Sequence, residues 1–304
     1  MTPMTPVDHV RPGPGGVSRR TRRLVTAVAA LVVLAAVPTF LVDGILNGTP
    51  VLDGSARGTA LTMLVLALPV LVAGLVGASR GSVRGGAALL GALGYLTYNA
   101  TLLVYATPFN QLFLVYVALL GSSLWSLVSA LLDPRPPLAP GTALPARGIA
   151  AFILTVVALN AAAWLRVVLP DLGEDPPGFL EGTGLTTNPI HVQDLAVWLP
   201  ALAVVAVLLW QRRPSGVHLA GAGLVFWVIE AVGVAVDQWF GHRADPTSDV
   251  ATLAGVSLFV VLASATLVPL VLWLRAVPAP AERRSPDPAG PRTARPVGDG
   301  GVRS

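Results

Sequence analysis

Eight long apolar segments alternate with shorter polar linkers along the 304-residue chain. Each segment has the roughly 20 residues that a helix needs to cross a bilayer core of about 30 Å. The predicted helices are Leu24–Leu46, Thr59–Ala78, Gly86–Thr107, Phe109–Leu132, Gly148–Leu169, Ile190–Trp210, Ser215–Val236 and Val250–Leu274. The pattern therefore predicts an all-α, polytopic transmembrane bundle of about eight helices.

The two ends of the chain are polar and rich in Pro, Gly and Arg, which is typical of disorder. We therefore expect a disordered basic tail over residues 1–23, an eight-helix transmembrane domain over 24–275 and a disordered Pro/Arg-rich tail over 276–304. Arg19–Arg23 and the apolar run after them resemble a signal peptide with a twin-arginine region. That run is too long for a signal peptide and seven more follow, so we interpret it as the first transmembrane helix.

Charge in the linkers alternates from one side of the predicted bundle to the other. All 20 basic residues are Arg, and 17 of them fall in one set of linkers and tails against 3 in the other. The positive-inside rule then places both termini in the cytoplasm of a multi-pass plasma-membrane protein. Only 12% of residues are charged and the mean hydropathy is +0.70, so the net charge of +4 reflects topology and not a nucleic-acid-binding surface.

Ionisable and amide side chains within membrane helices are costly and often mark a function. Glu230 lies seven residues before Asp237, about 10 Å inside the outer end of its helix. Tyr95, Tyr98, Asn99 and Tyr105 fit one helical face. We expect such faces to meet in the outer half of the bundle as an outward-facing polar pocket. Its candidate ligand-binding residues are Glu230, Asp194, His191, Asn99, Tyr95, Tyr98, Asn160 and Arg166.

Two interpretations of these residues remain open. The first is a transporter, or a transport-associated subunit, for a small ligand or cation. The second is a non-enzymatic structural or partner-binding membrane protein whose polar residues only pack helices. The expected partners are the lipid bilayer, a small ligand or cation, and another membrane protein.

Catalytic and metal motifs are weak or missing in the sequence. The chain has no Cys, no GxSxG and no P-loop, so an enzyme is the less favoured class, and no cofactor is predicted. His191 and Asp194, three residues apart, with Glu230 and His242 as further ligands, would be the candidate metal site. Because the sequence contains no HExxH or paired-His motif, no metal site is predicted.

Thr107-Pro108 predicts a very tight turn between the third and fourth helices. These helices should then be antiparallel neighbours, with the Tyr95–Tyr105 face between them. The GxxxG-like spacing Gly81–Gly85 is predicted to lie in a loop. The residues give no support for an internal duplication of four helices plus four.

The runs YLTYNATLLVYATPFNQLFLVYVALLGSSLWSL and TNPIHVQDLAVWLP resemble those of uncharacterised bacterial polytopic membrane proteins. The resemblance covers about a third of the chain. It implies a polytopic membrane fold and no particular activity.

Overall fold

The computed structural model describes residues 16–138 and 143–277, and all regular structure in them is helical. Eight helices are long and apolar enough to cross a membrane, which confirms the predicted fold class. Six of them are single α-helices: α1 (Arg19–Leu41), α4 (Val83–Tyr105), α5 (Phe113–Leu132), α6 (Ala146–Val168), α9 (Pro214–Ala244) and α10 (Leu253–Ala276). The other two are composite: α2 (Pro50–Thr62), η1 (Met63–Ala67) and α3 (Leu68–Ser79) form one, and α7 (Pro189–Gln193), η3 (Asp194–Trp198) and α8 (Leu199–Trp210) form the other.

The two composite helices each contain a π-helical segment just before a proline. Pro69 follows η1 and Pro200 follows η3 by two residues. Proline has no N–H and its ring clashes with the preceding turn, and the wider π turn gives that ring room. Both helices continue through the membrane in spite of their proline.

Several helices have other ends than the hydropathy pattern predicts, and α1 is shifted toward the N-terminus, ending at Leu41 and not at Leu46. α1 begins at Arg19, where the Ser18 side chain accepts a hydrogen bond from the Thr21 amide, so the four arginines fall on the helix and not in the tail. α2 starts at Pro50, and α9 continues past Val236 to Ala244. Most of the predicted tails lies outside the described residues.

The connection between α4 and α5 is longer than the predicted two-residue turn. It spans Ala106–Leu112, where Asn110 organises the backbone: its Nδ2 donates to the Pro108 carbonyl and its Oδ1 accepts from the Leu112 amide. The two helices pack against each other, as expected. Tyr105, however, is 64% exposed, so the Tyr95–Tyr105 face does not line their contact.

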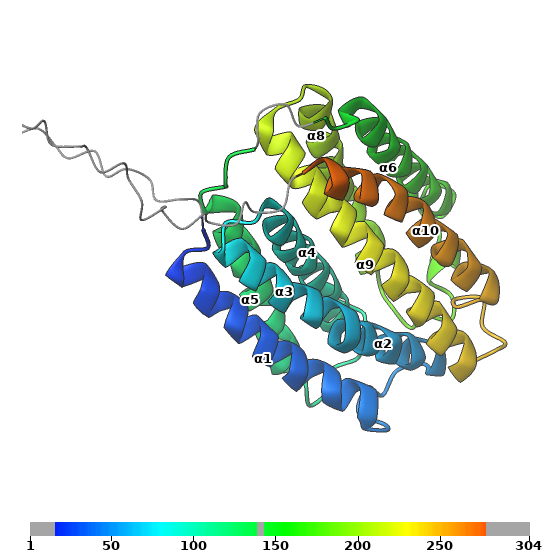
Figure 1. Ribbon diagram of the computed structural model, residues 1–304. Helices are drawn as coiled ribbons and strands as arrows, with labels where there is room; N and C mark the ends of the chain where they lie inside the picture. The colour runs from blue at the N-terminus through cyan, green and yellow to red at the C-terminus, as the bar shows by residue number, and fades with distance from the viewer. Residues whose placement is uncertain (1–15, 139–142, 278–304) are drawn as a thin grey trace, which may run out of the picture.

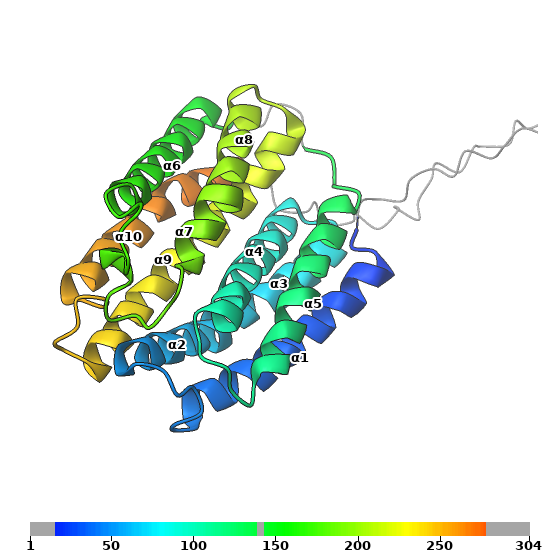
Figure 2. The ribbon, with the colours of Figure 1, turned by 180° about the vertical axis from the view of Figure 1, so that it is seen from behind.

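The bundle places helices α1 to α5 on one side and α6 to α10 on the other (Figure 1). α4 and α9 are the most buried spanning helices and pack against each other in the middle. Viewed from behind, α5 and α1 cover the outer face of the first group, and α6 lies at the far edge of the second (Figure 2). The centre of the molecule is therefore the contact between α4 and α9.

Glycines bring particular helix pairs into close contact. A Cβ on Gly54 would stand 2.6 Å from the Phe240 carbonyl oxygen, so α2 and α9 touch backbone to backbone. The pair Gly54 and Gly58 is a GxxxG spacing of the kind that favours such contacts. Gly81 lies in a turn with a φ of +78°, whereas Gly85 is inside α4 and packs against α3. The prediction that both glycines lie in a loop is therefore right for Gly81 and wrong for Gly85.

The charged residues divide between the two ends of the bundle. The arginine-rich end comprises the starts of α1 and α6, the α3–α4 and α8–α9 turns, the segment after α5 and the end of α10. Asp133 is the one acidic residue of the described chain at that end. The other described acids lie at the opposite end, which we call the acidic end, or inside the bundle.

Candidate functional site

Glu230 of α9 is bound by Asn99 of α4 inside the bundle. The Asn99 Nδ2 donates to Glu230 Oε2 at 2.9 Å and also approaches the Tyr95 carbonyl at 3.2 Å. Asn99 is 2% exposed, and Glu230 is partly buried. Sequence analysis named both residues, and the structure brings them into direct contact across the central helix pair.

Asp237 lies two turns further along the same face of α9 and is held by α2. The Thr59 hydroxyl donates to Asp237 Oδ1 at 3.0 Å, and the Ser55 hydroxyl donates to the Asp237 carbonyl at 3.3 Å. Thr59 is 5% exposed. A second carboxyl group therefore lies within the helix contact, where the sequence suggested only the outer end of a helix.

Tyr95 reaches between these two carboxyl-bearing turns. A Cβ on Gly233 would be 3.0 Å from the Tyr95 hydroxyl, and Gly233 lies three residues after Glu230 and four before Asp237. Tyr95 is 0% exposed, and its hydroxyl has no hydrogen-bond partner among the described residues. Buried polar atoms are nearly always paired, so we expect this hydroxyl to interact with the nearby Thr62 side chain, a water molecule or an ion.

In the part of the chain that the structure describes, no basic side chain forms an ion pair with either acid. The ion pair of the described chain joins Arg57 to Asp43 at 2.7 Å, on the partly exposed surface of the acidic end. We refer to Thr59, Tyr95, Asn99, Glu230 and Asp237 as the carboxyl site.

Asp194 and His191 form a second polar cluster, on the composite helix that starts at Pro189. The Trp164 indole N–H donates to Asp194 Oδ2 at 2.8 Å. The His191 ring lies between Trp164 and Phe179, at centroid distances of 4.5 and 5.4 Å, and its Nδ1 has no partner in the described chain. Asp194 and His191 are both buried, as expected for side chains that face the bundle.

Tyr98 lies near this second cluster in an aromatic group. Its ring is 5.9 Å from the rings of both Trp198 and Phe226, which stack on each other at 5.1 Å. The Trp198 indole N–H donates to Gln193, whose amide is 3.4 Å from the Tyr98 carbonyl. Tyr98 therefore links α4 to the composite helix and does not join the carboxyl site through a hydrogen bond.

Asn160 and Arg166 are not brought into either cluster by a hydrogen bond or an ion pair within the described residues. Asn160 is partly buried on α6, and Arg166 is exposed in the last turn of that helix. α6 packs mainly on α8, which places it at the edge of the bundle and away from α4. Within the described chain, no group of three or more His, Asp or Glu residues is placed to hold a metal ion.

Sequence reasoning missed Asp237, Thr59 and Trp164. Asp237 had a readable signal, because it is seven residues after Glu230 and so on the same face of a helix. It was interpreted as the membrane boundary because the apolar run ends there. Thr59 and Trp164 carry no comparable signal, since their roles depend on which helices pack together.

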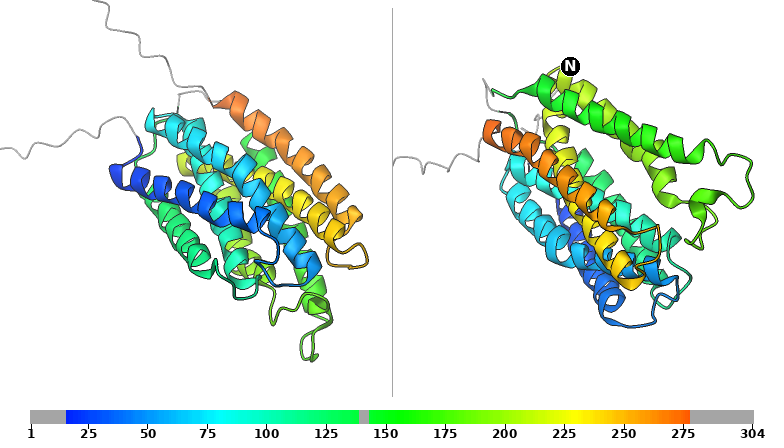
Figure 3. Two further views of the ribbon diagram at one scale, coloured as in Figure 1. Left: turned by 90° about the horizontal axis from the view of Figure 1, so that it is seen from below. Right: turned by 90° about the vertical axis from the view of Figure 1, so that its right-hand side faces the viewer.

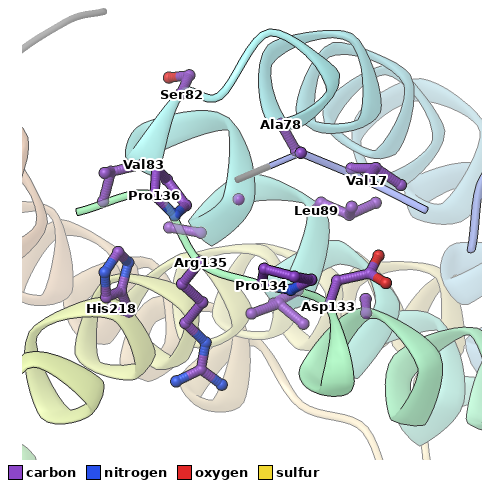
Figure 4. A pocket seen from close by; sticks show the side chains of 15 residues that line it. Val17, Ala78, Ser82, Val83, Leu89, Asp133, Pro134, Arg135, Pro136 and His218 are labelled. Atoms are coloured by element: carbon purple, nitrogen blue, oxygen red, sulfur yellow. The ribbon is translucent and has the colours of Figure 1, made fainter. Parts of the chain in front are cut away.

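Two clefts occur elsewhere in the described chain. One, of about 50 Å³, lies at the arginine-rich end, where Ser82, Asp133, Arg135 and His218 provide its polar lining (Figure 4). Burial lowers the pKa of the Arg135 guanidinium. The other, of about 710 Å³, lies between α2, α9 and α10 and is apolar except for Ser264. Neither cleft contains a predicted site residue, and the residues of the carboxyl site are joined by hydrogen bonds across closely packed helices.

Comparison with known proteins gives no assignment. No family model matches the chain, and neither a curated protein nor a solved structure is significantly similar to it. The functional argument therefore rests on the geometry of the chain itself.

Proposed function

We propose that this integral membrane protein is a transporter, or a subunit of one, that binds a small cation or a proton at the carboxyl site. The observation that carries the proposal is the pair of acids Glu230 and Asp237, which have no basic partner among the described residues, beside the Tyr95 hydroxyl, which has no hydrogen bond there. A carboxylate in the low-dielectric interior of a membrane protein is costly unless a positive charge compensates it. A bound cation or proton supplies that charge and gives the hydroxyl an interaction partner.

The close packing around the site favours an ion over an organic ligand. A Cβ on Gly58 would stand 2.8 Å from the Asp237 Cα, and Gly233 lies directly against the Tyr95 side chain. The space between these helices thus suits an ion or a water molecule. Of the two ligand classes left open by the sequence, this geometry favours the cation.

The distribution of charge supports the same interpretation. The acidic end of the bundle carries most of the described acids, including Asp171, Glu174 and Asp175 in the segment after α6. A surface of one sign raises the local concentration of ions of the other sign. If the arginine-rich end is cytoplasmic, as the positive-inside rule predicts, cations gather at the outer face.

The second candidate function is a structural or partner-binding protein whose acids only fasten helices. The hydrogen bonds from Asn99 to Glu230 and from Thr59 to Asp237 favour it, because each carboxyl already has one donor. The two candidate functions predict different effects of one conservative substitution, Glu230→Gln. Glu230→Gln keeps the size of the side chain but removes its ability to carry a charge.

A thermal-shift titration of the purified protein with Na⁺, K⁺, Li⁺ and protons tests the proposal. We expect at least one of these ions to raise the melting temperature. A ligand at 100 times its Kd stabilises by about 2.7 kcal/mol. The shift should disappear in Glu230→Gln and Asp237→Asn and persist in the matched control Glu181→Gln, an exposed acid of the segment after α6. An unchanged ion-dependent shift in both site variants would refute the proposal in favour of the structural role.

A further inference from the structure

The second and third spanning helices correspond to the sixth and seventh at a constant shift of 131 residues, the separation of Asn99 and Glu230. The π segment Met63–Ala67 corresponds to Asp194–Trp198, and α3 corresponds to α8, residue for residue at both ends. Pro69 and Pro200 match at the same shift. Even the π-type hydrogen bonds agree, since the Leu68 amide donates to the Met63 carbonyl and the Leu199 amide to the Asp194 carbonyl.

The turns that follow these helices repeat the same geometry. Gly81 and Arg212 are equivalent, and both have left-handed backbones, with φ of +78° and +55°. This conformation is uncommon for a residue other than glycine, so its occurrence at Arg212 is informative. The turn hydrogen bonds match as well: Gly81 to Ala78 at 2.9 Å and Arg212 to Leu209 at 2.8 Å.

The helices after the turns start with the same close contact. Gly85 of α4 packs on the backbone of Gly77 and Ala78 in α3. The equivalent Gly216 of α9 packs on the backbone of the equivalent residues, Leu208 and Leu209, in α8. One helix hairpin, with its π segment, proline, turn and glycine contact, therefore occurs twice in the chain.

Two pairs of equivalent residues touch each other. A Cβ on Gly91 would stand 2.7 Å from the carbonyl oxygen of its equivalent, Ala222. Asn99 donates to its equivalent, Glu230, at 2.9 Å. In an arrangement with two-fold symmetry, a residue meets its own equivalent only near the axis. We infer that the chain is a tandem duplication of a four-helix unit, with a pseudo-two-fold axis between α4 and α9 at these two pairs.

The packing of the central helices follows this arrangement, whereas α1 packs mainly on α5 and its equivalent α6 packs mainly on α8. α4 packs between α3 and α5, and α9 packs between α8 and α10. Across the interface, α2 contacts α9, and α7 contacts α4 in the equivalent way. In the left view of Figure 3, α10 and the end of α9 (orange and yellow) lie to the right of α1 and the α2–α3 helix (blue and cyan). Four spans return the chain to its starting side, so the two units are parallel repeats about an axis along the membrane normal.

The duplication gives the carboxyl site a specific place in the molecule. Asp194, Glu230 and Asp237 all belong to the second unit, and the first unit has Met63, Asn99 and Ala106 at the equivalent positions. The second unit thus supplies the acids, while Thr59, Tyr95 and Asn99 of the first supply neutral polar groups. The carboxyl site lies at the interface of the repeats, and the bond from Asn99 to Glu230 joins them at the axis.

The duplication can be tested by exchanging two equivalent side chains that meet at the axis and measuring the melting temperature. This test does not depend on the proposed function. Because Asn99 and Glu230 are equivalent, the double variant N99E/E230N should restore the hydrogen bond, with the amide now donating from α9 and the carboxyl group accepting on α4. We expect N99E alone to lower the melting temperature by about 3–8 °C and the exchange to recover most of that loss. At the second contact a Cβ on Gly91 would meet Val225 as well as the Ala222 carbonyl, and Val225 is the equivalent of Gly94. The exchange there is therefore G91A/G94V/A222G/V225G, compared with G91A alone.

The matched control is the exchange T59D/D237T. Thr59 and Asp237 are hydrogen-bonded but are not equivalent, since their counterparts are Ile190 and Ala106. The exchange should not recover stability there. Recovery in either axis pair, without recovery in the control, supports the duplication. If neither axis pair recovers, or if the control recovers equally, the inference is wrong. Because no cation is titrated, failure of ion binding would leave this result unaffected.

Discussion

Gly58 of α2 lies directly against the backbone of Asp237 in α9. A Cβ on Gly58 would be 2.8 Å from the Asp237 Cα and 2.9 Å from the Val236 carbonyl oxygen. Neither atom can move without moving α9 itself. This contact brings the next residue of α2, Thr59, within 3.0 Å of the Asp237 carboxylate, so helix packing and the geometry of the site have the same cause.

We expect Gly58→Ala to destabilise the protein by about 1–3 kcal/mol, because the added methyl group overpacks a backbone contact. Thermal unfolding in detergent measures the loss. Gly121→Ala is the matched control, since a Cβ at Gly121 in α5 meets nothing within 4 Å. Equal melting temperatures for the two variants would show that α2 and α9 are not held this closely.

The pair Asn99 and Glu230 should show the behaviour of a buried hydrogen bond. Asn99→Leu leaves the Glu230 carboxyl without its donor, at a cost of about 1–3 kcal/mol. The double variant N99L/E230L removes both polar groups and should be less destabilised than the sum of the two single variants. Additive losses in denaturation experiments would instead indicate that the two side chains do not interact.

The eight spans could be predicted from the sequence because length and apolar composition are local properties. Their ends could not, because a helix continues wherever its polar residues find partners. α9 passes Val236 as far as Ala244, and Thr59 of α2 binds Asp237 on the way. Tyr105 shows the converse: it fits the face of Tyr95 and Tyr98 by periodicity, yet it is exposed beyond the contact with α9.

The duplication was hidden in the sequence for a similar reason. Few of the equivalent residues are identical, although Leu68-Pro69 and Leu199-Pro200 agree. Many apolar side chains satisfy the same helix position, so the repeat is preserved in backbone features. These are a π segment, a left-handed turn and a glycine contact. The Gly54–Gly58 spacing was readable, but only the packing of α9 on it gives it meaning.

The orientation of the bundle is open to direct measurement. The chain has no Cys, so single-Cys variants need no prior removal of thiols. We expect Glu174→Cys to react with an impermeant maleimide in intact cells, and Gln211→Cys to react only after lysis. Both residues are exposed, at the acidic and arginine-rich ends respectively. The reverse labelling pattern would show that the arginine-rich end faces outward, contrary to the positive-inside rule.

Tyr95→Phe separates the two candidate functions most directly. The substitution removes only a hydroxyl that has no partner within the described chain, while the ring keeps its packing against Gly233. If the carboxyl site is purely structural, the loss of a buried, unpaired polar group should leave stability unchanged or slightly raised. If the hydroxyl contacts a bound cation or shares a proton with the acids, the variant should lose part of the ion-dependent rise in melting temperature.

The control for this variant is Tyr116→Phe. The Tyr116 hydroxyl is paired with Thr39 at 2.6 Å in the contact between α1 and α5, within the first unit and away from α9. Its removal should lower the free energy of unfolding by the cost of one hydrogen bond, about 1 kcal/mol, and so lower the melting temperature at every ion concentration. The two tyrosines thus give opposite signatures: loss of stability without loss of ion response at Tyr116, and loss of ion response without loss of intrinsic stability at Tyr95. An undiminished ion response in Tyr95→Phe would exclude the Tyr95 hydroxyl from the binding site.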